Sequence, residues 1–363
     1  MDSRPEAGKK GGQAMRQGMI ALGLLLAAVL CGGCGDDDKP EEKKLYLYTW
    51  SEYFTDKAKA GFKAKTGYEV VEDNYASPED MLAKLKTGGA EYDVVVATDY
   101  ILVSLIRDGL IEPIDAGKVP NKKNIARRFE NPSYDPGNKH CVPYLWGTVG
   151  IGVNIEKVKE KVDSWRVLWD EKYKGRISMP DSARDCLGIA FKLEGRSFNE
   201  KDPAAIQAAA ARLKAQKPHV KTYSSDFKPL LESAEVWLVA GWSGDILQLA
   251  REYPDRFRYV IPKEGGEIWV DSLCVPKASK HKDVAHQFLN YILEPEVHAE
   301  ISSARLYPCP NEAAMKHIPE AQRKDPDIYP PDEALRNCEL LESLGPEVDK
   351  LYLKAWTEVK GEE

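Results

Sequence analysis

The chain has 363 residues, a formal net charge of −7 and 43% hydrophobic residues. This length is sufficient for two ordinary domains. The acidic balance argues against nucleic acid as a partner, because phosphate backbones are bound by clustered basic side chains, and it mildly favours cationic ligands.

The first segment is predicted to be a secretory leader rather than part of the fold. Basic side chains precede the apolar run Met19–Leu30, which is too short to span a bilayer but typical of a signal peptide. Two glycines then precede Cys34, as in a lipobox, although Cys31 stands where such sites usually have Leu. We expect residues 1–33 to be removed and Cys34 to anchor the protein to a membrane in the periplasm. Ordinary secretion with cleavage nearby is the alternative.

Residues 34–43 are polar and charged, without apolar periodicity, and are expected to form a flexible tether. The leader carries four basic and two acidic side chains, so the rest of the chain carries −9. The cysteines beyond the leader form no C-x-x-C pair, which argues against a metal site. In an oxidising compartment they could form one or two disulfides, which the sequence does not assign. They are Cys141, Cys186, Cys274, Cys309 and Cys338.

Apolar, β-rich runs alternate with helical patterns in the first half of the mature chain. A helix is predicted to begin at Ser77, where a serine N-cap precedes Pro78 and two acidic residues. The alternation is typical of an α/β fold with a mostly parallel sheet. The other predicted elements here are strands at Leu45–Thr49, Tyr68–Tyr75 and Tyr92–Ala97 and helices at Thr55–Lys65 and Ile101–Asp108.

The alternation of apolar, β-rich runs with helical patterns begins again at Gly147. Two α/β stretches in a chain of this length indicate two lobes with a cleft between them. We expect lobe 1 at residues 44–145, with 274–335 returning to it, and lobe 2 at 146–273. Residues 336–363 are expected to pack at the junction of the lobes through a C-terminal helix. The predicted strands of the second half are Thr148–Asn154, Arg176–Met179, Glu235–Ala240, Arg258–Ile261 and Ile268–Val275, and its predicted helices are Ala183–Leu193, Pro203–Lys217, Asp245–Tyr253, Lys282–Leu293 and Glu296–Ser303.

Aromatic and acidic residues recur where the predicted strands end, which is where open α/β sheets bind ligands. Trp269 and Asp271 alternate along one strand and therefore share a face. Singly, each such residue is better explained as structural; Ser243 and Asp245 could simply cap a helix. The remaining strand-end residues are Trp50, Ser51, Glu52, Tyr53, Thr98, Tyr100, Asp185 and Trp242.

As a set, these residues suit an organic cation. A primary ammonium pairs with a carboxylate and is attracted to an aromatic face by about 0.5–2 kcal/mol, while methylenes pack on the rings. Several carboxylates in an empty cleft repel each other. A bound polycation removes this repulsion, which favours polycations over other ligands.

Enzyme chemistry is not indicated. The six histidines form no H-E-x-x-H pattern, and Gly241–Asp245 fails as a nucleophile elbow because Asp245 stands where G-x-S-x-G requires glycine. We expect no catalytic residue, no cofactor and no metal. A secreted enzyme is kept as a rival hypothesis.

Over roughly residues 44–356 the chain resembles the spermidine/putrescine-binding proteins of bacterial polyamine ABC importers. The resemblance implies a two-lobed, hinged periplasmic binding fold, type II-like, and a monomer that delivers its ligand to a membrane permease. Tyr144 and Trp146, which stand at the entry to the second half, could line the hinge. The resemblance also implies Glu52, Asp185 and Asp271 as ammonium-binding acids, and Tyr307 among the aromatic walls. The stretches that carry it are Leu45–Tyr53, Tyr92–Val96, Tyr144–Thr148, Ser182–Asp185, Pro262–Gly266, Trp269–Ser272 and Tyr307–Asn311.

The ligand stays open within this family. Spermidine-type members carry an acid where this chain has Ser182, whereas putrescine-type members carry an acid matching Asp245. Glu52, however, is the longer acid, as in spermidine-type members. Putrescine, spermidine and another cation are all retained, as are a polyamine sensor and a ferric or anion binder of the same fold. An anionic ligand would require arginines at the predicted strand ends, and only Arg184 lies there.

Overall fold

The computed structural model describes residues 43–88 and 91–361. The predicted leader, the predicted lipidation site Cys34 and the tether up to residue 42 lie outside the described residues. Within the described ranges, no helix has both the length and the apolar character needed to cross a membrane.

The strands of the described residues form one 10-stranded sheet. Its order is β2-β1-β3-β9-β4-β7-β5-β6, with β10 beside β9 and β8 beside β4. The strands are β1 (Lys44–Thr49), β2 (Glu69–Asn74), β3 (Val94–Thr98), β4 (Cys141–Asn154), β5 (Ile177–Met179), β6 (Val220–Tyr223), β7 (Leu238–Trp242), β8 (Phe257–Val260), β9 (Glu267–Cys274) and β10 (Glu339–Leu340).

Each half of the sheet has a parallel group of strands, and two long antiparallel strands join the halves. β1 is parallel to β2 and β3, and β5 is parallel to β6 and β7. β9 is antiparallel to β3 and β4, and β4 is antiparallel to β7. The prediction of a mostly parallel sheet is therefore right for each half and wrong for the junction, because apolar runs reveal a strand but not its direction.

β4 is a buried strand of 14 residues that begins well before the predicted start at Thr148. Pro143 removes one backbone donor, and the pairing with β9 shifts register between Pro143 and Leu145. These features hid the first half of the strand from the sequence pattern. The predicted boundary after residue 145 falls inside β4, and the division into lobes stays a prediction.

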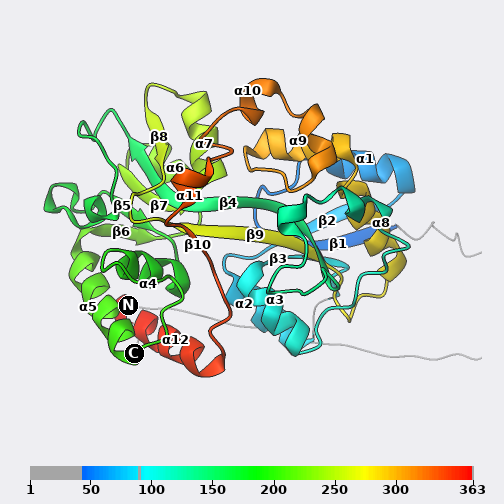
Figure 1. Ribbon diagram of the computed structural model, residues 1–363, viewed down its shortest axis with the longest axis horizontal. Helices are drawn as coiled ribbons and strands as arrows, with labels where there is room; N and C mark the ends of the chain where they lie inside the picture. Colours follow the sequence, from blue (N-terminus) through cyan, green and yellow to red (C-terminus); the bar gives the residue numbers. More distant parts are fainter. Residues whose placement is uncertain (1–42, 89–90, 362–363) are drawn as a thin grey trace, which may run out of the picture. The chain divides into compact units, whose positions relative to one another are not determined.

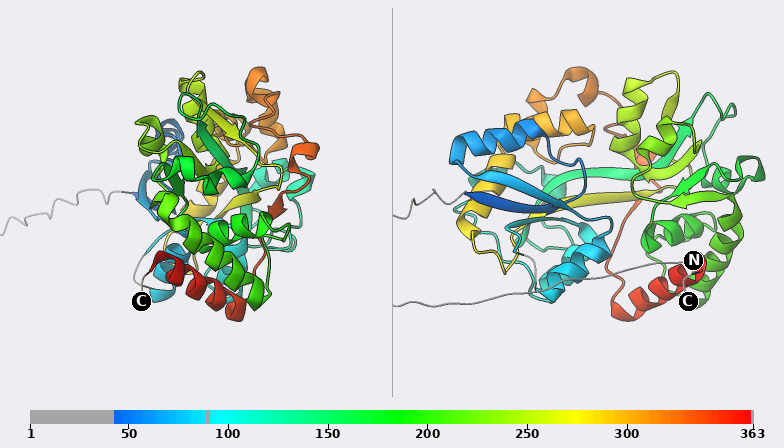
Figure 2. Two further views of the ribbon diagram at one scale, coloured as in Figure 1. Left: turned by 90° about the vertical axis from the view of Figure 1, so that its left-hand side faces the viewer. Right: turned by 180° about the vertical axis from the view of Figure 1, so that it is seen from behind.

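The helices cover the two halves of the sheet separately (Figure 1). The β1–β3 half carries α1, α2, α3, α8 and α9, whereas the β5–β7 half carries α4, α5, α6 and α7; Figure 2 shows the same arrangement from behind. The helices are α1 (Asp56–Thr66), α2 (Pro78–Thr87), α3 (Asp99–Arg107), α4 (Ala183–Lys192), α5 (Pro203–Gln216), α6 (Lys228–Glu232), α7 (Ser243–Glu252), α8 (Lys282–Ile292), α9 (Pro295–Arg305), α10 (Glu320–Arg323), α11 (Asp332–Leu335) and α12 (Pro346–Lys360).

Serine caps fix the starts of two helices that border the cleft described below. The Ser77 side chain accepts a hydrogen bond from the Asp80 amide, and Ser182 accepts one from the Asp185 amide. Such caps contribute about 1 kcal/mol each. The predicted helix start at Ser77 is confirmed, and the cap at Ser182 places Asp185 in the first turn of α4.

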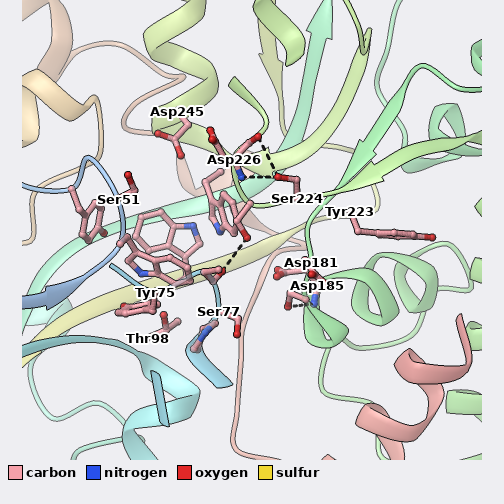
Figure 3. Close-up of a pocket in the computed structure, with 18 of the residues that line it drawn as sticks. Ser51, Tyr75, Ser77, Thr98, Asp181, Asp185, Tyr223, Ser224, Asp226 and Asp245 are labelled. Atoms are coloured by element: carbon pink, nitrogen blue, oxygen red, sulfur yellow. Dashed lines mark hydrogen bonds between the residues drawn. The ribbon is translucent and has the colours of Figure 1, made fainter. Parts of the chain in front are cut away.

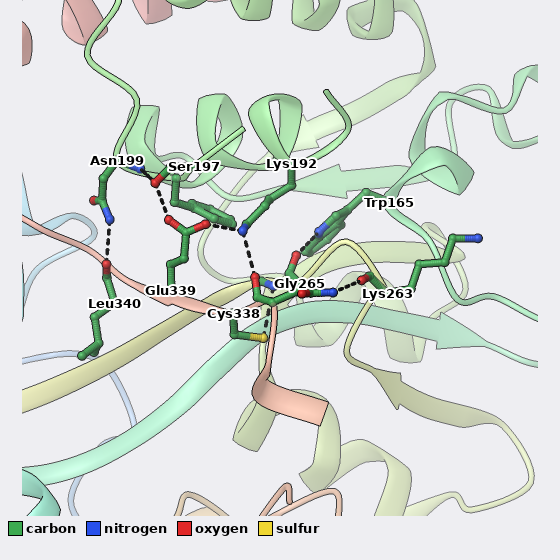
Figure 4. A network of polar contacts seen from close by, with 12 residues as sticks. Trp165, Lys192, Ser197, Asn199, Lys263, Gly265, Cys338, Glu339 and Leu340 are labelled. Carbon is green, nitrogen blue, oxygen red and sulfur yellow. Dashed lines mark hydrogen bonds and ion pairs between the residues drawn. The ribbon is translucent and has the colours of Figure 1, made fainter. Parts of the chain in front are cut away.

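The C-terminal segment is tied to the β5–β7 half before it reaches α12 (Figure 4). Lys192 of α4 donates to the carbonyl of Asn337 at 2.8 Å and forms an ion pair with Glu339 of β10. Asn199 donates to the carbonyl of Leu340 at 2.9 Å. Beyond these contacts, α12 packs against α4 and α5.

Candidate ligand-binding site

A cleft of about 1070 Å³ opens between the two halves of the sheet (Figure 3). Its walls come from the carboxyl ends of β1, β3, β5 and β7, from β9 and from the loops and helices that follow them. The twelve residues predicted to bind ligand all line this cleft. They are Trp50, Ser51, Glu52, Tyr53, Thr98, Tyr100, Asp185, Trp242, Asp245, Trp269, Asp271 and Tyr307.

Aromatic rings from both halves of the molecule form the middle of the cleft. Trp50, after β1, lies 6.1 Å from Trp242, at the end of β7, measured between ring centroids. Trp269 of β9 packs edge-on against Tyr307 at 5.0 Å, and Tyr75 lies 4.5 Å from Trp50. These rings offer an apolar surface long enough for several methylene groups and faces that attract cations.

Two glycines allow the rings this position. A Cβ at Gly147 would lie 2.5 Å from the Trp269 ring, and a Cβ at Gly244 would lie 2.5 Å from the Tyr307 ring. Both distances are shorter than van der Waals contact, so any larger residue would push a ring out of place. Gly147, near the start of the second half, thus helps to shape the cleft.

Asp271 lies at the floor of the cleft and is 4% exposed. The Thr98 hydroxyl donates to its Oδ1 at 2.7 Å. Burial raises the pKa of Asp271 to about 6, against the opposing effect of the Thr98 hydrogen bond and of the polar groups of Tyr53 and Trp50. A buried carboxylate in this setting gains from a cation more than an exposed one does, because water no longer stabilises its charge.

A second acidic group lies where α4 faces the start of β9. Burial and the neighbouring Asp185 carboxylate raise the pKa of Glu267 well above its usual range. Within the described residues, Oδ1 of Asp185 is buried without a hydrogen-bond partner. Nearby, Tyr100 donates to Glu79 at 3.0 Å, and the Arg184 guanidinium lies over the Tyr100 ring. Two adjacent carboxylates favour a shared cation or a shared proton.

A third acidic group, at Glu52 and Asp245, already contains a cation. Nζ of Lys228 lies 2.6 Å from Oε2 of Glu52 and 3.6 Å from Oδ1 of Asp245. The hydrogen bond from Lys228 lowers the pKa of Glu52. Glu52 has a φ of +54°, which is rare for a residue with a side chain and is often found at functional sites.

Asp245 does not serve as a helix cap, which was the simpler interpretation of its position. The N-cap of α7 is Trp242, without a side-chain cap hydrogen bond. Ser243 instead accepts a hydrogen bond from the Thr148 amide at 3.4 Å.

Tyr144 supports the cleft from beneath rather than lining it. Its hydroxyl donates to the Tyr53 carbonyl at 3.0 Å, and its ring stacks on Phe54. Trp146 packs on Phe129 away from the cleft. The predicted hinge role of both residues stays a prediction.

Among the lining residues that sequence reasoning missed, three bear most on the chemistry of the cleft. Glu267 shares the face of Trp269 and Asp271 on β9, and the same alternation could have revealed it. Tyr75 is the last residue of the predicted second strand, a position that also carried a signal. Lys228 carried no such signal in the sequence, because it begins a short helix that has no apolar periodicity.

The charge of the cleft is strongly negative. Eleven acidic side chains line it, against two basic ones, Lys228 and Lys360. No arginine lines it within the described residues. The same ranges contain no group of three or more His, Cys, Asp or Glu side chains arranged to hold a metal ion.

Comparisons with known proteins agree with this geometry. The spermidine/putrescine-binding periplasmic protein of Escherichia coli is 36% identical over 327 residues, which cover 89% of this chain and 93% of that protein. A putrescine-binding periplasmic protein of Pseudomonas aeruginosa is 33% identical, over 93% of this chain and 97% of its own. The structure of a spermidine/putrescine ABC transporter protein from Listeria monocytogenes superimposes with a TM-score of 0.84 at 32% identity, covering 88% of this chain and 99% of that one.

The two-lobed fold and the resemblance found in the sequence are thereby confirmed. The sequence model of the bacterial extracellular solute-binding protein family matches residues 57–328, which is most of the chain. The protein belongs to the bacterial extracellular solute-binding protein family.

Proposed function

We propose that this protein binds a small polyamine outside the cytoplasm and delivers it to the permease of an ABC importer. The observation that carries the proposal is the set of three acidic groups along one aromatic cleft, centred on the buried Asp271. Relatives that share at least 30% identity with the chain are named as putrescine- or spermidine-binding proteins, which supports the same ligand class.

The electrostatics of the cleft favour this ligand over the rival ligands. Each ammonium of a polyamine can pair with one acidic group, while its methylenes pack against Trp50, Trp242 and Trp269. An anionic ligand would face eleven acidic side chains in a partly desolvated space, at a cost of several kcal/mol. Arg184, the basic residue at the strand ends, instead donates to the Glu342 carbonyl and to the side-chain oxygen of Asn199.

Three further features belong to the same proposal. The protein acts as a monomeric carrier and not as an enzyme, since the cleft offers binding groups rather than a nucleophile with its base. Its location is the periplasm, as for the relatives whose names include that compartment. Lipidation at Cys34 would keep it beside its permease.

A thermal-unfolding series on the purified protein tests the proposal. At a hundredfold excess over Kd, a ligand that binds only the folded state adds about 2.7 kcal/mol of stability. We expect this increase with putrescine or spermidine and none with amino acids or ferric citrate. An increase with ferric citrate alone, or none with any polyamine, would contradict the proposed ligand.

A further inference from the structure

The two halves of the molecule meet across the cleft through a lysine. Lys228 is the first residue of α6, on the β5–β7 half, whereas Glu52 follows β1 on the other half. Their side chains form a hydrogen-bonded ion pair of 2.6 Å. The lysine ammonium is also 3.6 Å from Asp245.

This arrangement reproduces what a polyamine terminus would experience. An alkylammonium at the end of a methylene chain lies between the carboxylates of Glu52 and Asp245. Burial works against the charge of Lys228, but Asp245 and Glu52 outweigh it, so the pKa of Lys228 is raised. The side chain is 23% exposed, which leaves it accessible to exchange with a ligand.

The other two acidic groups lack such an internal partner, although Asp181, which also lines the cleft, pairs with Lys360 at 3.2 Å. Among the described residues, neither Asp271 nor Glu267 forms an ion pair with a lysine or arginine, and Oδ1 of Asp185 has no hydrogen-bond partner. Figure 3 shows Asp245 and Asp185 on different sides of the cleft. One acidic group therefore already contains a cation, and the other two depend on the ligand for one.

We propose that Lys228 occupies one of the ammonium positions of the cleft and thereby selects against long polyamines. A short diamine binds at Asp271 and the Asp185–Glu267 pair with Lys228 in place. A triamine that reaches Glu52 and Asp245 must first displace the lysine ammonium. The inference rests on the proposed function and adds the residue that sets ligand length. It also changes the significance of Asp245, whose carboxylate faces a lysine rather than an open position.

The test compares Kd values for putrescine and spermidine by calorimetry at one salt concentration. The variants are wild type, Lys228→Met, which keeps the length of the side chain, and the control Lys221→Met. Lys221 pairs with Glu235 outside the cleft at 2.9 Å, so the control makes the same change in net charge on the same half. We expect Lys228→Met to shift the ratio of the two Kd values at least tenfold toward spermidine, and Lys221→Met to leave it within twofold.

A double variant tests whether the gain comes from the vacated acids. Lys228→Met with Glu52→Gln removes one of the carboxylates that the third ammonium would use, so most of the spermidine gain should disappear. A spermidine acetylated at one end, which lacks one terminal charge, should show no gain with Lys228→Met. Lys228→Gln repeats the test with a polar side chain should the methionine variant unfold at a lower temperature.

The outcomes separate this inference from the proposed function. If wild type binds a polyamine but Lys228→Met leaves the Kd ratio unchanged, or strengthens both ligands equally, the proposal for Lys228 is wrong while the function stands. If wild type binds neither putrescine nor spermidine, the function fails, and the selection by Lys228 fails with it.

Discussion

The two ends of the cleft hold their carboxylates in different ways. At one end, Lys228 supplies one positive charge to the two carboxylates of Glu52 and Asp245; it lowers the pKa of Glu52, whereas burial still raises that of Asp245. At the other end, Glu267 lies beside Asp185, and burial with mutual repulsion raises its pKa. The first end holds an internal cation, whereas the second is relieved only by a proton or a bound cation. We therefore expect Asp271 and the Asp185–Glu267 pair to contribute most of the free energy of ligand binding.

The largest effect is expected at the centre, from Asp271→Asn. The substitution keeps the shape and removes the charge that faces the ligand, so affinity should fall by at least about 2 kcal/mol, or some thirtyfold. Calorimetric titration with putrescine measures the loss. The melting temperature of the unliganded variant should not fall, because a buried charge has been removed. Unchanged affinity would exclude Asp271 from the site.

The next effect separates the two ends directly. Asp185→Asn removes an acid without an internal cation and should weaken a diamine about tenfold, near 1.4 kcal/mol. Glu52→Gln makes the same charge change where Lys228 already compensates it, and should weaken the diamine less than threefold. Equal losses in the two variants would contradict the difference drawn between the ends.

The dependence on pH follows from the pKa of Asp271, which burial raises to about 6. A bound ammonium favours the carboxylate, so binding below this pKa must release a proton. Affinity should therefore fall about tenfold as the pH is lowered from 7 to 5. Titrations in buffers of different ionisation enthalpy would detect the released proton. Asp271→Asn should flatten the profile, and an equally steep profile in that variant would assign the proton to another group.

The unliganded protein should show the opposite trend. Because the folded pKa of Asp271 lies above its usual value, the folded state binds more protons than the unfolded state between about pH 4 and 6. This group's contribution to stability therefore decreases as the pH rises through that window. Urea unfolding of wild type and Asp271→Asn across the window measures the difference, and identical slopes in the two proteins would contradict it.

The smallest effect is expected at the rim. The Ser225 hydroxyl donates to the Ala76 carbonyl across the cleft at 3.2 Å. This hydrogen bond is exposed, so Ser225→Ala should change ligand affinity by less than about 1 kcal/mol. A larger loss of ligand affinity, measured by calorimetry, would show that this hydrogen bond across the rim contributes more to binding than expected.

Much of the site could be predicted because strand ends are visible in the sequence. Apolar runs before Trp50, Thr98 and Trp242 located the carboxyl ends of strands, and the fold brings those ends to one cleft. The alternation of Trp269 and Asp271 gave their shared face, although Glu267, one step earlier on the same face, was missed.

Other features depend on contacts that no local pattern encodes. Lys228 and Glu52 are separated by 176 residues in the sequence, and only the folded chain brings them together. The antiparallel direction of β9 is equally a product of the chain path. Pro143 and the glycines of β4 concealed a strand whose length comes from pairing along β9.

A crystal structure of the protein with a saturating diamine tests the central claim most directly. We expect one ammonium at the Asp271 carboxylate, the other at the Asp185–Glu267 pair, the methylenes against the tryptophan rings, and Lys228 still paired with Glu52. A cleft without ligand at saturation, or a diamine bound between Glu52 and Asp245 with Lys228 displaced, would contradict this arrangement.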